Sequence, residues 1–393
     1  MGFRYVVLGA GRQGTAAAYD LARFGEADAI LLVDARPDVA AASAARVNAL
    51  AAREVATPLV TDVTTAGRLL EGAHVCLSAV PYFLNLDLTH AAIEARVHFC
   101  DLGGNTDVVL AQLGLDEQAR QSGVAIVPDC GVGPGLIANL AVHAIEQLDE
   151  ARDVLIYDGG LPQKPSPRFN YRLWFAVEGL TNEYAGDALY IENYDLARVP
   201  CFDEREYELV DLPGVGRLAA FSTAGGLSTM ASPWRGHLRT LKNKTLRYPG
   251  HAAMIRSFID IGLMSLDPVE VDGAPVVPRH LLHALLTPRF APASDDRDLM
   301  VIHIVAYGIK KGAPHRVTVD MLDLHDEATG FSAMERTTGF HLAIVAGMLA
   351  RGHIALGAVP LEVAVPARRM VEEVAMRGMR VETTVASEVG VAR

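Results

Sequence analysis

Cysteine is scarce in this sequence, because the 393 residues contain four and none of them forms a Cys-x-x-Cys pair. So few and scattered thiols exclude a disulfide framework and predict reduced, mostly buried side chains. The histidines, including His280 and His283, lack metal-ligand spacing with carboxylates or thiols, so no metal site is predicted. Long apolar runs are absent too, since no uninterrupted stretch reaches the length of a membrane span.

A secretion signal and an excess of positive charge are also lacking. The sequence opens with MGFRYVVLGAG and shows no charged segment followed by an apolar run and a cleavage site, so we expect a soluble, cytoplasmic protein. Lys and Arg number 35 against 47 Asp and Glu, which gives a formal net charge of −12. An acidic surface repels phosphate backbones and anionic lipids, so neither nucleic acid nor a membrane is an expected partner. A small molecule is the expected partner.

The first 130 residues show the alternation typical of an α/β fold. Half of all residues are hydrophobic, which is enough for a large core, and the length predicts two domains or a little more. Short apolar runs alternate here with Ala- and Leu-rich stretches of helical spacing. The runs are Tyr5–Leu8, Ile30–Val33, Val75–Ala79, Val97–Asp101 and Ala125–Val127. This pattern predicts a doubly wound parallel sheet of the Rossmann type.

The pattern changes after Val154, where strand-like segments follow one another. They are Val154–Tyr157, Glu206–Asp211, Arg217–Ser222, Val301–Tyr307 and Arg316–Leu324, with a hairpin tip at 310–313. Such a succession predicts a second domain with a mostly antiparallel sheet. The cations from Arg235 to Lys244 are predicted to lie on a solvated helix face.

The end of the sequence is predicted to return to the first domain. Phe340–Ala350 reads as an apolar helix with Thr338 as its N-cap, and a helix that is apolar on most sides must be buried. The tail after Arg377 is predicted to be loose. We therefore divide the chain into residues 1–132 (dinucleotide binding), 133–332 (substrate binding and dimerisation) and 333–375 (returning helices).

The first strand is followed by Gly9-Ala10-Gly11-Arg12-Gln13-Gly14. In a dinucleotide-binding turn, the first glycine permits the tight turn, the second lets the backbone approach the pyrophosphate, and the third lets helix and strand pack closely. Asp34 ends the next strand, where a carboxylate accepts hydrogen bonds from the adenosine ribose. Together the two signals predict an NAD(P) site. Asp34 favours NAD because it would repel a 2′-phosphate, whereas Arg36 leaves NADP open.

Further cofactor contacts are expected at the carboxyl ends of the strands, where ligands of such sheets bind. Beyond the three glycines, Asp34 and Arg36, the candidates are Arg12, Gln13, Ala35, Asp62, Val63, Ser78, Ala79, Val80, Pro81, Asn85, Leu102, Gly103, Gly104 and Asn105. The segment 129–135 either borders the nicotinamide, forms a glycine-rich crossover between domains, or does both. Cys130 has no obvious histidine partner and is interpreted as structural.

Arg247 stands apart from the other cations of the second domain. It lies in Thr245-Leu246-Arg247-Tyr248-Pro249-Gly250-His251, beside an aromatic residue, a Pro-Gly turn and a histidine. The planar guanidinium can hold a carboxylate through two parallel hydrogen bonds. Arg247 is therefore the candidate for binding a substrate carboxylate.

Roughly residues 3–375 resemble the saccharopine dehydrogenase-like oxidoreductases. The segments that carry the resemblance are GAGRQG (9–14), SAVPYFLN (78–85), DLGGN (101–105), DCGVGPGL (129–136), GGLP (159–162), FAVEGLTNEY (175–184), FSTAGGLST (221–229), KTLRYPGH (244–251) and AMERTTGFHLA (333–343). The resemblance implies a Rossmann domain completed by C-terminal helices, an inserted α+β domain and a homodimer. It also implies that the segments SAVP and DLGG border the nicotinamide. Where saccharopine reductases carry an aspartate in GxDPG, this sequence has Gly133, which is more similar to the lysine-oxidising branch.

The resemblance further implies an NAD-dependent enzyme that oxidises the ε-amine of lysine and releases ammonia. Lysine's ε-ammonium must lose a proton before hydride can leave its carbon, so a general base is needed. The candidates for this role are Asp129, Glu178 and His251, and those for substrate binding are Arg247, Tyr248 and Tyr171. Two alternatives stay open: an enzyme acting on a larger secondary amine, such as saccharopine or carboxynorspermidine, and a non-catalytic NAD-sensing protein.

Overall fold

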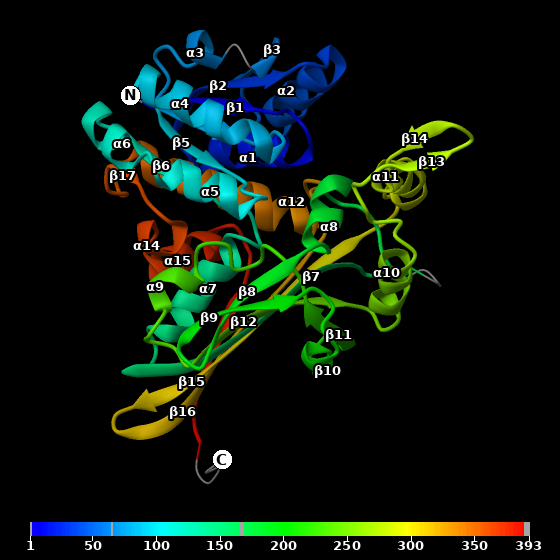
Figure 1. Cartoon of the computed structure of the whole chain (residues 1–393). Helices are drawn as coiled ribbons and strands as arrows, with labels where there is room; N and C mark the ends of the chain where they lie inside the picture. Colours follow the sequence, from blue (N-terminus) through cyan, green and yellow to red (C-terminus); the bar gives the residue numbers. More distant parts are fainter. Residues whose placement is uncertain (1, 64–65, 166–168, 389–393) are drawn as a thin grey trace.

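A computed structural model describes residues 2–63, 66–165 and 169–388. The first domain is built on a seven-stranded parallel sheet in the order β17-β6-β5-β4-β1-β2-β3, in which β17 comes from the C-terminal part of the chain. Its strands are β1 (Phe3–Leu8), β2 (Ala27–Asp34), β3 (Ala56–Val60), β4 (Val75–Ser78), β5 (His98–Asp101), β6 (Ala125–Val127) and β17 (Gly357–Ala358). The predicted Rossmann-type sheet is confirmed, and it lies at the top of Figure 1.

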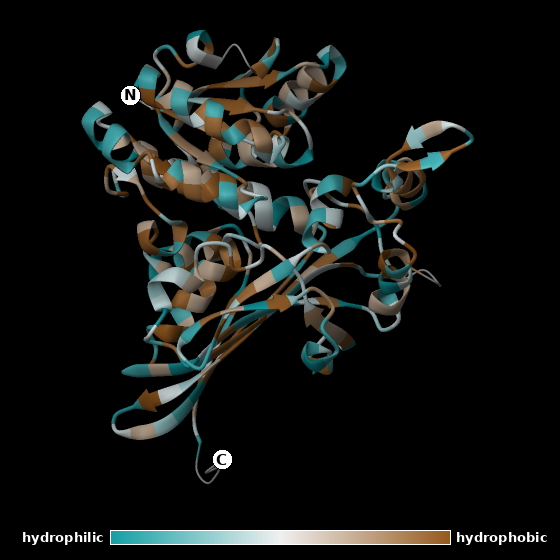
Figure 2. Cartoon of the chain, in the orientation of Figure 1, coloured by the Kyte–Doolittle hydropathy of each residue, from teal (hydrophilic) through white to brown (hydrophobic). Residues whose placement is uncertain are grey.

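Helices cover both faces of this sheet, as the apolar strands require. Tyr5 and Val7 of β1 belong to one core cluster, while Val6 and Leu8 belong to the other. A strand buried on both faces is apolar throughout rather than alternating, and Figure 2 shows the inner strands as largely hydrophobic. The helices are α1 (Arg12–Phe24), α2 (Pro37–Ala51), α3 (Ala66–Leu69), α4 (Asn85–Ala95), α5 (Thr106–Leu113) and α6 (Asp116–Ser122).

The second part is built on a larger sheet with the order β10-β11-β12-β7-β15-β16-β18, to which β8 and β9 are added beside β12. Its strands are β7 (Glu150–Pro162), β8 (Asp187–Glu192), β9 (Asp195–Pro200), β10 (Glu208–Leu212), β11 (Gly216–Ser222), β12 (Thr240–Arg247), β15 (Asp298–Lys310), β16 (Ala313–Leu324) and β18 (Val381–Ser387). All its pairings are antiparallel except that of β12 with β7. The predicted mostly antiparallel second sheet is confirmed.

The remaining helices surround the second sheet and its junction with the first. They are α7 (Leu136–Ile145), α8 (Val177–Glu183), α9 (Ala231–Trp234), α10 (His251–Asp260), α11 (Pro278–Phe290), α14 (Leu361–Ala364) and α15 (Ala367–Met376). A small hairpin of β13 (Val269–Val271) and β14 (Ala274–Val276) projects beside α11 in Figure 1. Among the described helices, none combines the length and apolarity needed to cross a lipid bilayer.

The returning helix begins earlier than the sequence predicted. Ser332, not Thr338, is the N-cap, because its hydroxyl accepts the Glu335 N–H while the Glu335 carboxylate accepts the Ser332 N–H. From there α12 (Ala333–Glu335), the π-helical turn η4 (Arg336–Phe340) and α13 (His341–Ala350) run on without a break. The predicted docking is confirmed, since α13 packs on β4, β5 and α1.

Two other sequence-based expectations were wrong. The cations from Arg235 to Lys244 do not lie on a helix face. Lys242 and Lys244 belong to β12, inside the large sheet, and Arg235 and Arg239 lie between the end of α9 and the start of β12. As far as Ser387 the tail beyond Arg377 is not loose, because β18 pairs with β16 along its whole length. In both segments the backbone forms hydrogen bonds with strands that are distant in the sequence, and the local sequence pattern does not predict such pairing. The division at residues 132 and 332 stays a prediction.

Candidate functional site

The glycine turn between β1 and α1 has the geometry of a dinucleotide site. Gly9 has φ +93°, in the left-handed region that glycine adopts without strain. At Gly14 an added Cβ would lie 1.8 Å from the Gly9 carbonyl oxygen, whereas at Gly11 it would meet open space. Gly9 and Gly14 thus close the turn, while Gly11 leaves the helix N-terminus accessible to a phosphate.

The side chain of Gln13 supports the fit of a bound cofactor. Its amide Nε2 and Oε1 atoms are both buried and have no hydrogen-bond partner among the described residues. Buried polar atoms are nearly always paired in folded proteins, so two orphaned atoms on the glycine turn indicate a polar group supplied by a ligand. The residues present therefore fit NAD(P).

Asp34 ends β2 and faces the same turn. Its carboxylate accepts hydrogen bonds from the Ala10 N–H at 3.1 Å, the Arg36 N–H at 3.0 Å and Arg36 Nε at 3.1 Å. Burial disfavours the charged form, but these hydrogen bonds outweigh it and lower the pKa of Asp34. The acid stays ionised, as an acceptor of ribose hydroxyl groups must be.

A hollow of about 520 Å³ adjoins Asp34 and carries three arginines. Arg12 forms an ion pair with Glu335 at 3.1 Å, and Arg46 lies 4.1 Å from the ring centre of Phe331. The Arg36 guanidinium is largely exposed. Asp34 bonds to Ala10 and Arg36 of this lining, so an acceptor for ribose hydroxyl groups adjoins a hollow with three cations, which suits both NAD and NADP.

We expect Asp34→Ala to narrow a preference for NAD+ over NADP+ by about 1–3 kcal/mol in kcat/KM, because charge-assisted hydrogen bonds to the ribose are lost. Steady-state kinetics with both cofactors measure the change. Asp38→Ala, which removes a nearby exposed carboxylate at the start of α2, is the control and should leave the ratio unchanged. Equal efficiency with both cofactors in the unmutated protein contradicts the prediction.

The other predicted cofactor residues lie at the carboxyl ends of neighbouring strands, as expected for this sheet. Ser78 Oγ donates to Asn85 Oδ1 at 2.7 Å, which fixes the segment of Ala79, Val80 and Pro81 between them. Gly103 N–H donates to Asp101, and the Asn105 side chain caps α5. These contacts hold the SAVP and DLGGN segments in place. They do not show which of these residues contacts the cofactor. The remaining candidates lie at the ends of β2, β3 and β5, namely Ala35, Asp62, Val63, Leu102 and Gly104.

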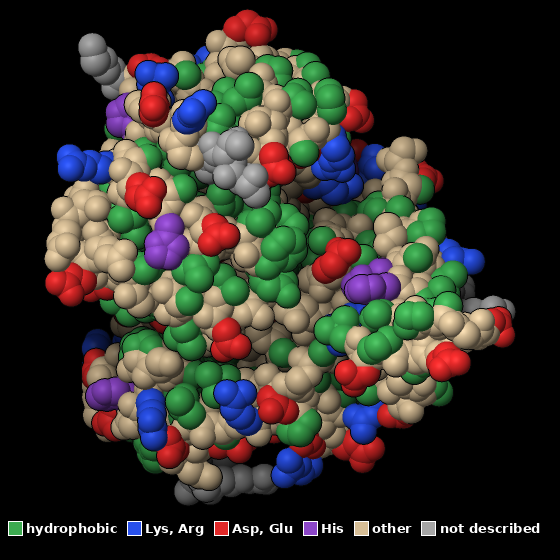
Figure 3. All heavy atoms as spheres, turned by 45° about the horizontal axis from the view of Figure 1, so that its top comes forward, with side chains coloured by type: hydrophobic (Ala, Val, Ile, Leu, Met, Phe, Trp, Pro, Cys, Tyr) green, Lys and Arg blue, Asp and Glu red, His purple; other side chains and the backbone are tan. Residues whose placement is uncertain are grey.

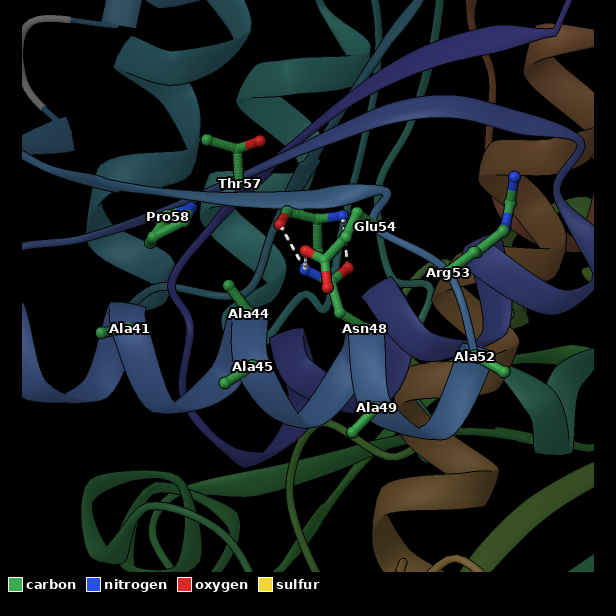
Figure 4. A pocket seen from close by; sticks show the side chains of 11 residues that line it. Ala41, Ala44, Ala45, Asn48, Ala49, Ala52, Arg53, Glu54, Thr57 and Pro58 are labelled. Carbon is green, nitrogen blue, oxygen red and sulfur yellow. Dashed lines mark hydrogen bonds between the residues drawn. The ribbon is translucent and has the colours of Figure 1, made fainter.

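A second and larger hollow, of about 850 Å³, lies on another face of α2 against β3 (Figure 4). It is lined mainly by alanines. Asn48 projects there and bonds to the Glu54 carboxylate and to the backbone of Val55 and Ala56. The side chain closes the connection from α2 to β3, so this hollow shows no chemistry of its own.

Strand β12 presents a row of polar side chains on one of its faces. Asn243, Thr245 and Arg247 alternate along the strand and therefore point to one face, while Lys242 and Lys244 point to the other. The two lysines pair with Glu206 on that other face at 2.6 and 3.1 Å. One face of the strand thus carries lysines that form ion pairs within the sheet, and the other face carries the candidate binding residues.

Arg247 is buried and strongly partnered. Its Nη2 atom lies 3.3 Å from Glu183 Oε1, and Nε donates to the Tyr184 hydroxyl at 3.1 Å. Its guanidinium carbon lies 5.1 Å from the ring centre of Tyr171 and 5.9 Å from that of Tyr184. Burial opposes the charge, but the electrostatic attraction of these neighbours outweighs it and raises the pKa of Arg247. Arg247 is a fixed, permanently charged cation.

The structure brings Tyr171 to Arg247 but not Tyr248. Tyr248 points to the opposite side of the chain, where its hydroxyl donates to the Pro162 carbonyl at 2.9 Å. The two aromatic residues belong to different core clusters. Period-two alternation separates neighbours in the sequence, which is why Arg247 and Tyr248 do not face one pocket.

His251 is fully enclosed beside this group. Its Nε2 bonds to the Tyr184 hydroxyl at 3.0 Å, and its Nδ1 bonds to the Phe169 carbonyl at 3.2 Å. Burial, and then the charge of Arg247, lower the pKa of His251 to about 3. The ring is therefore neutral and has both nitrogen atoms engaged.

Glu178 lies apart from these residues. Its side chain is 70% exposed on α8 and comes within 3.8 Å of His283. One helical turn further on, Asn182 Nδ2 donates to the Gly104 carbonyl at 2.9 Å. Helix α8 therefore touches the DLGGN segment of the first domain, but Glu178 itself lies in solvent.

Asp129 occupies the junction of the two domains. It has φ +64° and is buried, and its Oδ2 accepts a 2.6 Å hydrogen bond from Ser228 of the second domain. Its Oδ1 is buried without a partner among the described residues, against the backbone of Gly103. Burial raises the pKa of Asp129 to about 8, and the charges of Asp101 and Glu362 add to the effect.

Such a perturbed carboxyl group at a domain junction is typical of a functional site. The adjacent Cys130 is buried, and burial raises the pKa of its thiol, which agrees with the structural interpretation. Among the described residues, no group of three or more His, Cys, Asp or Glu side chains converges as metal ligands.

We expect Asp129→Asn to flatten the pH dependence of thermal stability. Between the ordinary pKa of 3.8 and the folded value of about 8, the folded state holds a proton that the unfolded chain releases. Stability should therefore fall as pH rises through this range, and the Asn variant should lose that part of the slope. Melting temperatures from pH 5 to 9 measure it, with Asp320→Asn on the large sheet as control. Parallel profiles for the wild type and the Asp129 variant contradict the prediction.

Three residues beside Arg247 were not predicted from the sequence. They are Glu183, its ion-pair partner, and Asp158 and Asn243, which share a 2.7 Å hydrogen bond. Glu183 lies inside the FAVEGLTNEY segment and Asp158 directly precedes GGLP. One signal in the sequence could have identified part of this group. If the segment had been predicted as a strand, the alternation of Asn243, Thr245 and Arg247 would have placed these three side chains on one face.

Three features define the class of protein. They are the glycine turn, Asp34, and a second sheet that brings charged side chains to the domain junction. The class is a two-domain, NAD(P)-binding protein of the dehydrogenase type. Residues 5–127 match the saccharopine dehydrogenase NADP binding domain, and residues 131–379 match the saccharopine dehydrogenase C-terminal domain. The chain belongs to the saccharopine dehydrogenase family.

Individual relatives are distant. Carboxynorspermidine synthase of Vibrio cholerae is 26% identical over 269 residues, covering 62% of this chain and 60% of the relative. The mitochondrial alpha-aminoadipic semialdehyde synthase of Mus musculus is 21% identical over 354 residues, covering 73% of this chain and 38% of the relative. The chain thus spans less than two thirds of the length of either relative.

Solved structures show the same fold at low identity. Saccharopine dehydrogenase (L-Glu forming) from Saccharomyces cerevisiae superposes with a TM-score of 0.77 at 17% identity, covering 98% of this chain and 100% of that one. Homospermidine synthase from Legionella pneumophila, in complex with NAD, gives 0.66 at 11% identity, covering 98% and 92%.

Proposed function

We propose that the protein is an NAD(P)-dependent dehydrogenase that oxidises the ε-amine of L-lysine, the activity of a lysine 6-dehydrogenase. The observation that carries this proposal is the buried Arg247, held by Glu183 and two tyrosines next to a segment that contacts Gly104. A fixed guanidinium at that position suits the α-carboxylate of an amino acid whose side chain extends toward the first domain.

The proposed reaction converts lysine, NAD+ and water into 2-aminoadipate 6-semialdehyde, ammonium, NADH and a proton. The cofactor supplies the hydride acceptor. The enzyme must first take a proton from the ε-ammonium, whose ordinary pKa is about 10.4. Water then hydrolyses the imine, and the aldehyde cyclises with the α-amine to piperideine-6-carboxylate.

Asp129 is the strongest of the three candidate bases. Its carboxyl group is buried, has one oxygen without a hydrogen-bond partner among the described residues, and has a pKa of about 8, so it can hold and release a proton near neutral pH. Glu178 lies in solvent, and His251 has both nitrogen atoms engaged and its pKa lowered to about 3. We therefore assign proton transfer to Asp129, with Arg247 and Tyr171 on the substrate side.

A second candidate function is formation or cleavage of a secondary amine. It is favoured by the 26% identity with carboxynorspermidine synthase, although Gly133 takes the place of the aspartate in the GxDPG segment of saccharopine reductases. The reductive direction separates the two: the lysine enzyme needs free ammonia, whereas the other needs an amino acid or diamine as amine donor.

The test is a screen for NADH formation, followed by the absorbance of the reduced cofactor, with L-lysine, saccharopine, diamines and other amino acids. Turnover with L-lysine supports the proposal, and turnover with saccharopine alone supports the second candidate. If no amine reduces either cofactor while the cofactor still binds, the non-catalytic alternative gains support.

Homodimerisation, implied by the family resemblance, belongs to the same proposal. Figure 3 shows acidic and basic side chains interspersed over the face in view. Large apolar side chains are exposed around α10 and α11, among them Ile261, Leu266 and Leu281. Light scattering of the purified protein measures the oligomeric state.

A further inference from the structure

The hollow beside the glycine turn has one wall that comes from the far end of the chain. Its other lining residues come from residues 10–46, which form the glycine turn, the start of α1 and the segment from Arg36 into α2. Glu335 lines it from α12, in the returning segment. In a dinucleotide-binding fold the pyrophosphate binds at the N-terminus of the first helix and the adenosine ribose binds near the end of the second strand. The hollow is therefore the place for this ribose, which carries a 2′-hydroxyl in NAD and a 2′-phosphate in NADP.

Close packing against α1 brings Glu335 to this position. At Gly339, four residues further along, an added Cβ would lie 2.7 Å from both the Ala16 Cβ and the Gln13 carbonyl oxygen. Only a residue without a side chain lets the returning helix approach the first turns of α1 so closely. Glu335 precedes Gly339 by about one helical turn, so it lies on the same side of the helix and meets Arg12, the first residue of α1.

The carboxylate of Glu335 is buried and has both oxygens engaged. Oε2 accepts the Ser332 N–H at 2.7 Å, and Oε1 lies 3.1 Å from Arg12 Nε. The side chain of Glu335 is 3% exposed, whereas that of Arg12 is 48% exposed. The carboxylate is thus held by its own helix, and it fixes the half-exposed guanidinium at the wall of the hollow.

The charges that line or adjoin the hollow are nearly balanced. Arg36 pairs with Asp34 at 3.1 Å, Arg12 pairs with Glu335 at the same distance, and Arg46 donates to a backbone carbonyl at 3.3 Å. Two of the three cations are therefore compensated by carboxylates. A phosphate monoester carries a charge of about −1.5 to −2 near pH 7. The hollow thus suits an uncharged ribose diol better than a 2′-phosphate.

We infer that Glu335 is a specificity-determining residue for the cofactor: by holding and neutralising Arg12 it disfavours the 2′-phosphate of NADP. Glu335 acts here as a positioning residue, since its effect passes through Arg12. It adds to the selection expected from Asp34, but it comes from the C-terminal segment, so docking of that segment contributes to the choice of cofactor. The inference rests on the NAD(P) site alone and is tested without any amine.

The experiment measures the dissociation constants of NADH and NADPH by calorimetry. For Glu335→Gln we expect the affinity for NADPH relative to NADH to rise about tenfold, because the amide keeps an acceptor for the Ser332 N–H but leaves the charge of Arg12 uncompensated. Arg12→Gln should shift the same ratio by a similar factor in the opposite direction, because Glu335 then lacks its cation. A general loss of stability cannot produce two opposite shifts.

Ser332→Ala is the matched control. It removes the hydroxyl that accepts the Glu335 N–H and weakens the start of α12, but it leaves both charges in place. Its ratio of affinities should equal that of the wild type, and melting temperatures report how far each variant is destabilised.

Three results would overturn the inference. In the first, Glu335→Gln leaves the ratio unchanged or changes both affinities equally. In the second, Arg12→Gln does not lower the ratio, and in the third, Ser332→Ala raises it as much as Glu335→Gln does. Failure of L-lysine to reduce NAD+ contradicts the proposed function only, because no amine takes part in these measurements.

Discussion

Arg247→Ala is expected to lower kcat/KM with L-lysine by about 30-fold to 1,000-fold, or about 2–4 kcal/mol, since the proposed function gives Arg247 a buried charged contact to the substrate carboxylate that alanine cannot make. Arg247 is 4% exposed and lies against Glu183, Tyr171 and Tyr184. Arg247→Lys should restore only part of the activity, because an ammonium cannot reproduce the planar, two-pronged contact. Steady-state kinetics on NADH formation measure both variants.

Cadaverine, which is lysine without its carboxylate, is the control substrate. Its turnover should hardly change in Arg247→Ala, so that the ratio of lysine to cadaverine efficiency collapses. Cofactor affinity and the melting temperature report whether the variant is folded, which matters because Glu183 loses its ion-pair partner. Equal losses with both substrates would assign Arg247 to structure or cofactor positioning.

Arg377→Ala is expected to lower the free energy of unfolding by about 3–5 kcal/mol, the effect of leaving a buried charge without its partner. Arg377 Nε lies 2.6 Å from Asp20 Oδ1 and its Nη2 lies 2.7 Å from Oδ2, with both residues buried. The pair joins the end of α15 to α1 of the first domain. Burial raises the pKa of Asp20, and loss of the arginine removes the main opposing influence.

Urea denaturation followed by circular dichroism measures this change. Arg368→Ala is the matched control, because Arg368 lies on the same helix and its ion pair with Glu372 is exposed. Exposed pairs contribute little, so this variant should unfold close to the wild type. If both variants lose a similar free energy of unfolding, the buried pair stabilises the returning segment no more than an exposed pair does.

The element order of the first domain followed from the sequence because its signals are local. Apolar runs such as Tyr5–Leu8 and Ile30–Val33 are strands buried on both faces, and the turn after the first requires glycine for steric reasons. The presence of a dinucleotide-binding turn could therefore be predicted from the sequence, while the individual cofactor contacts stay predictions. Asp34 was found by the same logic, since its position at the end of β2 is fixed by the length of the intervening helix.

The second domain could be predicted only in outline. Its strands depend on partners far away in the sequence, such as β7 with β12 and β16 with β18, and no local pattern encodes such pairing. Arg247 was singled out by its neighbours in the chain, yet Tyr248 lies on the other side of the strand. Glu178 was chosen from a segment in which the acid that pairs with Arg247 is Glu183.

By itself, then, the sequence determined the Rossmann-type domain, its cofactor turn, the returning apolar helix and the presence of a mostly antiparallel second sheet, because these follow from periodicity and from the steric demands of glycine. Only the tertiary structure decided which charges meet at the domain junction. Burial raises the pKa of Asp129, and the packing of α8 beside β12 pairs Arg247 with Glu183. Those properties depend on distance and desolvation, which arise only when separate strands are brought together.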